Sequence, residues 1–140
     1  MPNKYFIIAE GIGFGHIARC SQLYYALEKK GKVTIFTFGD SYKRAKELGL
    51  NVENLNFDFV LSTDKNGLNV EYNAIEYIKD IKILEVAKLA AKIRKEKPKV
   101  LFVDSSIIGL IVASLTRHPN IIYITNNNTN AVSNTSCKFY

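Results

Sequence analysis

The chain has 140 residues, a length that fits one domain with a single hydrophobic core. With 47% hydrophobic and 23% charged residues and a net charge of +6, its composition is that of an ordinary soluble globular protein. The longest apolar run, IIGLIVASL, has about half of the roughly 20 residues that a membrane span requires. No small-residue cleavage site follows the N-terminal apolar run, so we expect no signal peptide and a cytoplasmic location.

The first third of the chain alternates apolar runs with helical patterns. YFIIA (5–9) is typical of a buried parallel strand, and it stops at a glycine turn. A helix is expected over 16–30, with Gly31 at its end. KVTIFTF predicts the second strand, GDSYKRAKELGL a short helix capped by Asp40 or Ser41, and NVENLNF the third strand.

The remaining elements follow the same alternation. Asn66-Gly67 favours a tight turn, so 58–72 is expected to form a loop or small hairpin. A helical pattern covers roughly 74–97 and ends before Pro98, and its apolar stripe changes phase near Lys82. KVLFVD is the fourth strand, SSIIGLIVASLTRH the fourth helix and NIIYIT the fifth strand, and the tail 126–140 shows no periodicity.

Strands that alternate with helices predict an α/β fold: a Rossmann-like open parallel sheet with helices on both faces. Right-handed crossovers make 3-2-1-4-5 the expected strand order. In that order the carboxyl ends of strands one and four are neighbours at the switch point, where ligands bind in such sheets. The loop that holds Gly11 to His16 should therefore meet Asp104.

The loop after the first strand has the spacing G-x-G-x-G, with Gly11, Gly13 and Gly15 followed by His16. Such glycines let the backbone turn sharply and approach a ligand, while the helix start behind them favours anions. The third glycine of a dinucleotide fingerprint is missing, and Asp40 comes too late to hold a ribose at the end of strand two. Both features disfavour NAD, and the lack of a following lysine excludes a P-loop.

The pattern GxGxGHxxR resembles the start of GT-B-fold glycosyltransferases, in particular the MurG-like group and related "GFGH" proteins. The similarity extends through FTFGDSYKRAKELG, PKVLFVDSS and IIYITNNN, although only the first motif is specific. By resemblance, the fold would be half of a two-domain enzyme. Residues 1–140 would form a single Rossmann-like domain, the incomplete N-terminal acceptor side, and a missing C-terminal domain or subunit would bind the nucleotide sugar, expected to be a UDP-sugar. The chain alone would then not be a competent transferase.

The resemblance gives His16 the role of general base and Asp104 that of the group that orients it. Imidazole titrates near neutral pH and can take a proton from an attacking hydroxyl, while a carboxylate on its other nitrogen fixes the tautomer. Two other readings remain open: His16 as a residue that bonds its own turn, and Asp104 as the cap of the fourth helix beside Ser105 and Ser106.

Other candidates lie around the same loop. Arg19, one turn after His16, is expected either to meet a phosphate of the substrate or to form a surface ion pair. Phe14, at the tip of the loop, would contact the acceptor or a partner domain. Asn126, Asn127 and Asn128 follow the fifth strand, either as turn residues or as hydrogen-bonding groups for sugar hydroxyls. His118, beside Pro119, is expected to be incidental.

Cysteine spacing and charge suggest what else the protein binds. Cys20 and Cys137 lie far apart, so we expect neither a disulfide nor a zinc site, and a buried Cys20. Between 77 and 99 there are eight Lys/Arg and three acids, which is either a solvated helix face or a site for an anionic membrane or phosphate-bearing acceptor. No nucleic-acid motif appears, so no nucleic-acid partner is expected.

Three hypotheses follow. The first is an acceptor-binding domain of a glycosyltransferase, with a sugar acceptor that is either soluble or linked to a lipid at the inner membrane face. The second is a nucleotide- or NAD-binding Rossmann domain. The third is a non-catalytic module that binds a partner through the exposed end of its sheet. Replacement of His16 separates the first from the third, and an NAD(H) titration tests the second.

Overall fold

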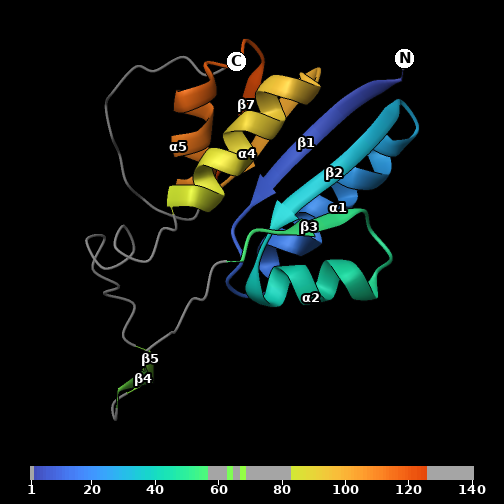
Figure 1. Cartoon of the computed structure of the whole chain (residues 1–140). Coiled ribbons are helices and arrows are strands. Elements are labelled where there is room, and N and C mark those ends of the chain that lie inside the picture. Colours follow the sequence, from blue (N-terminus) through green and yellow to red (C-terminus); the bar gives the residue numbers. More distant parts are fainter. Residues whose placement is uncertain (1, 57–62, 65–66, 69–82, 126–140) are drawn as a thin grey trace, which may run out of the picture.

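A computed structural model describes residues 2–56, 63–64, 67–68 and 83–125. Its centre is a five-stranded parallel sheet with the order β3-β2-β1-β6-β7 (Figure 1). In chain order, β6 and β7 are the fourth and fifth strands of this sheet. This confirms the predicted α/β fold and the predicted strand order 3-2-1-4-5.

Helices and strands alternate along the chain, and each predicted element of this part has a counterpart. The sheet consists of β1 (Asn3–Ala9), β2 (Gly31–Thr37), β3 (Val52–Asn54), β6 (Val100–Asp104) and β7 (Ile121–Ile124). The helices are α1 (Gly15–Glu28), α2 (Gly39–Glu47), α4 (Ile83–Glu96) and α5 (Ile107–Thr116). Two further strands of two residues each, β4 (Thr63–Asp64) and β5 (Gly67–Leu68), pair in antiparallel orientation, as expected for a small hairpin in this region.

The sheet is covered on both faces because its central strands are apolar on both sides. In β1, Phe6 and Ile8 point into a core shared with α4 and α5, while Tyr5 and Ile7 point into a second core shared with α1 and α2. Figure 1 shows α4 and α5 on one side of the sheet and α1 and α2 on the other. Helices on both faces leave the two ends of the sheet as the places where loops meet.

Two local expectations about helix ends have different outcomes. Phe38, not Asp40 or Ser41, is the N-cap of α2, because the helix already begins at Gly39. The end of α4 agrees with the sequence: the helix stops at Glu96, Lys97 has a φ of 46°, and Pro98 follows. The part of the expected helix before Ile83, including the phase change near Lys82, lies outside the described residues.

Among the described helices, none combines the length and the apolar character needed to cross a bilayer.

Candidate functional site

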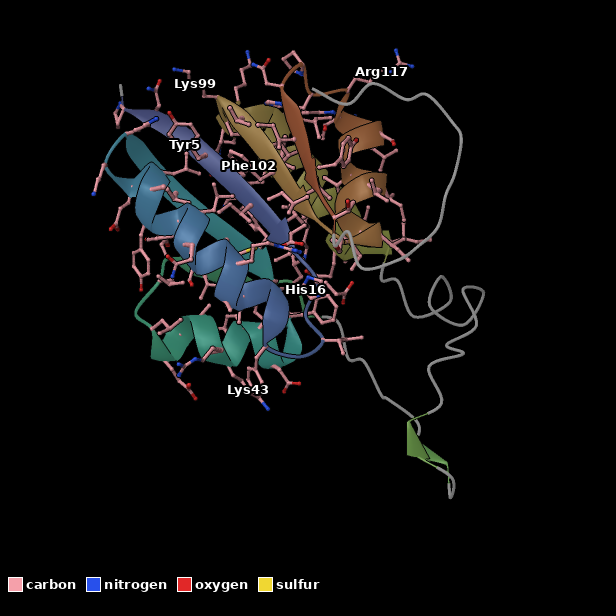
Figure 2. All side chains as sticks on the ribbon, turned by 180° about the vertical axis from the view of Figure 1, so that it is seen from behind. Tyr5, His16, Lys43, Lys99, Phe102 and Arg117 are labelled. Atoms are coloured by element: carbon pink, nitrogen blue, oxygen red, sulfur yellow. The ribbon has the colours of Figure 1, made fainter. Side chains whose placement is uncertain are left out.

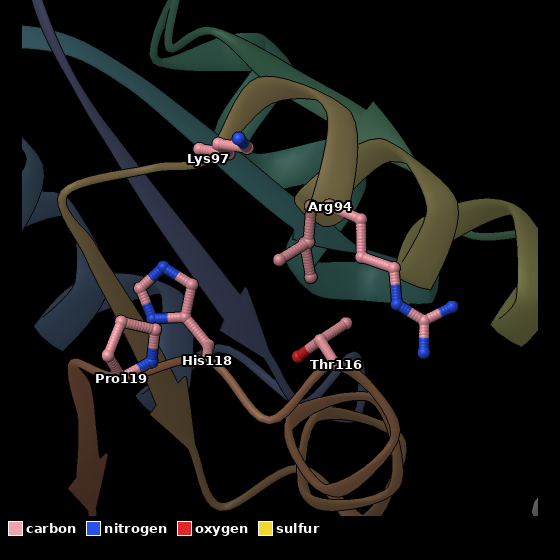
Figure 3. Close-up of a pocket in the computed structure, with 6 residues that line it drawn as sticks. Arg94, Lys97, Thr116, His118 and Pro119 are labelled. Carbon is pink, nitrogen blue, oxygen red and sulfur yellow. The ribbon is translucent and has the colours of Figure 1, made fainter.

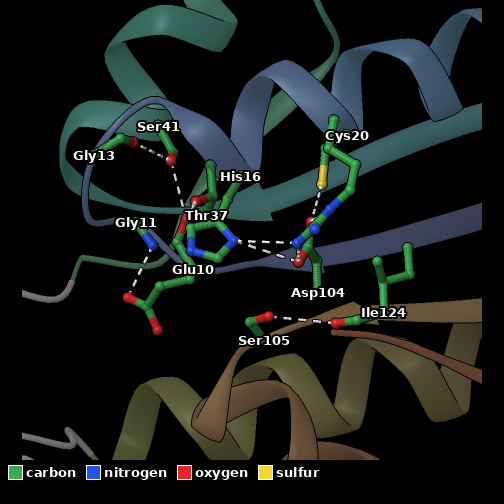
Figure 4. Close-up of polar contacts among 11 residues, drawn as sticks. Glu10, Gly11, Gly13, His16, Cys20, Thr37, Ser41, Asp104, Ser105 and Ile124 are labelled. Atoms are coloured by element: carbon green, nitrogen blue, oxygen red, sulfur yellow. Dashed lines mark hydrogen bonds and ion pairs between the residues drawn. The ribbon is translucent and has the colours of Figure 1, made fainter. Parts of the chain in front are cut away.

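The site lies where β1 and β6 end side by side. Ala9 pairs with Asp104 in the sheet register, and the Glu10 amide continues the ladder by donating to the Asp104 carbonyl at 3.2 Å. The glycine loop begins at the next residue and leads into α1, so the first turn of α1 lies over the end of β6. The predicted meeting of the loop with Asp104 is therefore present (Figure 4).

Asp104 is the centre of the site, and its side chain is fully buried. The guanidinium of Arg19 holds it with two contacts, Nε to Oδ2 at 3.1 Å and Nη2 to Oδ1. The thiol of Cys20 donates to Oδ2 at 3.1 Å. A buried carboxylate is tolerated only when it is paired and hydrogen-bonded, and these two α1 residues meet that requirement.

The carboxylate also changes the acid–base behaviour of its neighbours. The hydrogen bond to Asp104 raises the pKa of Arg19, which keeps the guanidinium charged. Burial, with the adjacent carboxylate, raises the pKa of Cys20 well above its ordinary value. Cys20 is therefore a protonated donor to Asp104 and not a nucleophile.

His16 is the more exposed partner of Asp104, with 20% of its side chain accessible. Its Nδ1 lies 3.3 Å from Asp104 Oδ1 and 3.5 Å from Arg19 Nη2. A neutral ring whose Nδ1 carries the proton donates to the carboxylate, whereas the other tautomer accepts from Arg19. In the first case Nε2, on the far side of the ring, keeps a lone pair for a ligand.

Polar contacts anchor the glycine loop to the neighbouring elements. The hydroxyl of Ser41 donates to the Glu10 carbonyl at 2.9 Å and lies 3.1 Å from the Gly13 carbonyl. Thr37, at the end of β2, is buried and its hydroxyl lies 3.4 Å from the same Glu10 carbonyl. Glu10 folds its carboxylate back onto the Gly11 amide at 3.0 Å. The loop is thus held from both β2 and α2.

The three loop positions differ in whether and why they require a glycine. A Cβ on Gly11 would come within 2.4 Å of the Phe38 carbonyl oxygen, and Gly13 has a φ of 74°. Gly15 has neither constraint: a Cβ there would meet no atom within 4 Å, and its φ is not positive. Nothing within the described chain requires glycine at position 15, which begins α1 beside His16.

The capping hypothesis for Asp104 is wrong. Ser106 is the N-cap of α5, and its hydroxyl oxygen accepts from the Gly109 amide at 3.0 Å. Asp104 instead faces α1. Arg19 forms an ion pair, but with a buried carboxylate and not at the surface. Phe14 lies at the loop tip with 63% of its surface exposed, whereas Asn126, Asn127 and Asn128 lie outside the described residues.

His118 is not incidental, because it joins the starts of β6 and β7. Its Nε2 lies 2.7 Å from the Pro98 carbonyl, and its Nδ1 accepts from the Asn120 amide at 3.1 Å. The neutral Nε2–H tautomer satisfies these two contacts but not a third, in which Nδ1 lies 3.0 Å from the Asn120 carbonyl oxygen. His118 also lines a cavity of about 300 Å³ at the end of the sheet away from His16 (Figure 3), together with Ile93, Arg94, Lys97, Thr116 and Pro119.

Sequence reasoning missed the bonding roles of Cys20, Ser41 and Glu10. The spacing of His16, Arg19 and Cys20 on one helix indicates a shared face, which could have directed all three toward Asp104. Ser41 gave no such indication, because its position was already explained as a cap. In the described part of the chain, no group of three or more His, Cys, Asp or Glu side chains is placed to hold a metal ion.

Comparison with known proteins supports the fold. No protein-family model matches the chain, and no curated protein matches its sequence. Two solved structures are similar. One is the glycosyltransferase VinC in complex with dTDP, with a TM-score of 0.59 and 20% identity. The other is SsfS6, a glycosyltransferase from Streptomyces sp. SF2575, with a TM-score of 0.56 and 19% identity.

These similarities cover 87% and 88% of this chain, but only 34% and 38% of the two glycosyltransferases. The chain thus spans little more than a third of the length of either structure. At this level of identity the likeness concerns the fold: it agrees with the glycosyltransferase-type Rossmann-like fold expected from the glycine motif. The resemblance to the MurG-like group is not tested by it.

Proposed function

We propose that this chain is the acceptor-side domain of a glycosyltransferase, with His16 as the general base that activates the acceptor hydroxyl. The observation that carries the proposal is the contact of His16 Nδ1 with the buried carboxylate of Asp104, at the sheet edge beside the glycine loop. A base whose second nitrogen is held by a carboxylate is the arrangement that fixes the tautomer for proton transfer.

The reaction would be a displacement at the anomeric carbon of a nucleotide sugar, expected to be a UDP-sugar. The acceptor oxygen forms a bond to that carbon as Nε2 of His16 takes the hydroxyl proton. The bond from the carbon to the diphosphate oxygen breaks, and the nucleoside diphosphate leaves with the electron pair. The Asp104 carboxylate stabilises the imidazolium that forms, while Arg19 and Cys20 hold the carboxylate in place.

The open space at Gly15 supports an acceptor that comes close to the start of α1. None of the described residues requires this position to be free of a side chain. An acceptor whose hydroxyl points at His16 Nε2 would lie over the first turn of the helix, with the exposed ring of Phe14 at its border. We infer that Gly15 and Phe14 contact the acceptor and that Gly11 and Gly13 shape the loop.

The donor would bind elsewhere. Because the chain matches only about a third of two glycosyltransferases, we infer that a further domain or a partner subunit supplies the nucleotide-sugar site. The acceptor would be a hydroxyl compound, either soluble or lipid-linked. The end of β2 gives a dinucleotide site little support, since the buried Thr37 occupies the place of a ribose-binding acid and Asp40 lies in the first turn of α2.

The test is sugar transfer by the protein together with its donor-binding domain or subunit. Replacement His16→Gln should lower kcat by about 10²–10⁴-fold, with the KM for the donor nearly unchanged, because general-base catalysis is lost while donor binding is not. Gln22→Ala, at an exposed position of the same helix, is the matched control and should keep kcat. Unchanged transfer by His16→Gln would refute the base assignment.

A further inference from the structure

The cations of the chain gather at the end of the sheet that lies opposite His16. The basic face, as we define it, consists of residues at or near strand starts and helix ends: Lys29 and Lys30 after α1, Lys32 in β2, Lys95 in α4, Lys97 and Lys99 before β6, and Arg117 after α5. All seven side chains are exposed. Figure 2 shows Lys99 and Arg117 at one end of the molecule and His16 toward the other.

The strand register places these charges in one layer. Lys4 pairs with Lys32 across β1 and β2, and the Lys99 amide donates to the Lys4 carbonyl at 2.7 Å. Three lysines therefore follow one another along neighbouring strands, about 5 Å apart from strand to strand. Like charges at this spacing repel each other, and of these three lysines only Lys4 forms an ion pair with a described residue.

Few acids offset the basic face. None of its seven cations forms an ion pair with a described residue, whereas the lysines beside it do. Glu96 is engaged by Lys4 at 3.2 Å and Lys92 at 3.7 Å, and Glu28 is exposed at the end of α1. Among the described residues these seven charges are therefore without an ion pair, although Glu96 also attracts Lys32, and they can attract an external anion.

We propose that the basic face docks the protein on an anionic phospholipid surface. The charges spread over the ends of three helices and two strands, so they form a platform and not a groove. The strands alone span about 20 Å, and the helical layers widen the platform by about 10 Å on each side. Clusters of exposed Lys and Arg on such a surface are attracted to the headgroups of anionic lipids.

The helix ends of the basic face provide no fixed phosphate site of the kind that nucleic-acid binding uses. Proteins position nucleic-acid phosphates with backbone amides and helix N-termini in addition to cations. At the basic face α1, α4 and α5 present their C-termini, which carry partial negative charge and no amide donors. Arg94 illustrates this, since its guanidinium is turned toward the Leu115 carbonyl near the end of α5, at 2.6 Å. The remaining attraction comes from flexible side chains and is diffuse.

If the proposed function holds, docking in this orientation restricts which acceptors can reach the candidate site. Strand β1, with seven residues, separates the basic face from the His16 edge by about 23 Å. The candidate site would then face the aqueous phase, so a soluble acceptor fits better than one whose sugar lies at the headgroups. The docking itself does not depend on the transferase activity and is measured without it.

The experiment is co-sedimentation of the protein with vesicles of phosphatidylcholine, with and without phosphatidylserine. The wild type should bind only the anionic vesicles, and binding should disappear as ionic strength rises from about 0.01 M to about 1 M. The triple variant Lys30→Gln/Lys95→Gln/Lys99→Gln should bind about 100-fold more weakly. The control Lys43→Gln/Arg44→Gln/Lys88→Gln removes three exposed charges from α2 and the first half of α4, and should bind nearly as well as the wild type.

Three results would overturn the proposal. The first is equal binding of the wild type to neutral and anionic vesicles, and the second is an equal loss by the control triple variant. The third is binding of a DNA duplex that is tighter than vesicle binding and lost in the Lys30/Lys95/Lys99 variant, which would assign the face to nucleic acid. Circular dichroism verifies folding, and if the triple variant is unfolded, Lys99→Gln alone should weaken binding about five-fold.

Discussion

The two ends of the same parallel sheet use polar residues in opposite ways. At the carboxyl end, Asp104 is fully buried and each of its neighbours is fixed by a hydrogen bond or an ion pair. At the amino end, the basic face leaves seven cations exposed. Fixed geometry is what proton transfer needs, whereas mobile exposed charge is sufficient for attraction to a surface. The comparison therefore agrees with the proposal that chemistry takes place at one end and docking at the other.

The largest effect on stability is expected from the carboxyl end. Replacement Arg19→Met leaves the buried Asp104 carboxylate without its cation, and loss of one partner of a buried pair costs about 3–5 kcal/mol. Denaturant unfolding measures the change. Arg44→Met is the matched control, because Arg44 forms an exposed pair with Glu47 that is worth less than about 1 kcal/mol. Equal losses in the two variants would remove the distinction between fixed and exposed charges.

Substitutions in the glycine loop are expected to change the free energy of unfolding less than Arg19→Met does, and the change should differ between Gly11 and Gly15. Gly11→Ala should lower the free energy of unfolding by about 1–3 kcal/mol, because its Cβ would overlap the Phe38 carbonyl. Gly15→Ala should be neutral or stabilising by up to about 1 kcal/mol, since the space is open and the backbone is not strained.

The two glycine substitutions also separate an effect on stability from an effect on acceptor binding. In the transfer assay, Gly15→Ala should raise the KM for the acceptor although the protein is at least as stable. If Gly15→Ala leaves the acceptor KM unchanged, the inferred approach of the acceptor to the start of α1 is wrong.

The smallest effect is expected at the amino end, for Glu96. Burial alone would raise the pKa of Glu96, but Lys4 and Lys92 lower it overall. A lowered pKa in the folded state means that the stabilisation exists above the unfolded pKa of about 4.3 and is lost as pH falls through the folded value. At pH 7 the free energy of unfolding of the wild type should therefore exceed that of Glu96→Gln by about 0.5–1 kcal/mol. This difference should disappear in acid. Glu47→Gln, at a more exposed pair, should show almost no gap.

The sequence was sufficient to predict the fold because the alternation of strands and helices is regular. Short connections and right-handed crossovers leave one natural order, and that order places His16 and Asp104 at the same edge of the sheet. The ends of helices were harder. Ser41 looks like a cap in the sequence, but α2 already begins at Gly39, and the Ser41 hydroxyl bonds the loop instead.

The remaining contacts of the site depend on which neighbouring group each side chain bonds, and this is set by the packing of the elements. Arg19 was expected to meet a phosphate or a surface acid, and only the packing of α1 on the sheet shows that a buried carboxylate is within its reach. His118 next to a proline gave no sign of its contact with Pro98, twenty positions earlier. The basic face combines cations from three separate stretches of the sequence, 29–32, 95–99 and 117, and the basic excess noted in 77–99 covers only the second of them.

The most direct test of the central assignment is the tautomer of His16, observed by ¹⁵N NMR of the imidazole at a pH at which the ring is neutral. The account predicts that Nδ1 carries the proton and donates to Asp104, which leaves Nε2 as the acceptor for a substrate proton. A proton on Nε2, with Nδ1 accepting from Arg19, would contradict the general-base role and leave His16 as a structural member of the Asp104 cluster.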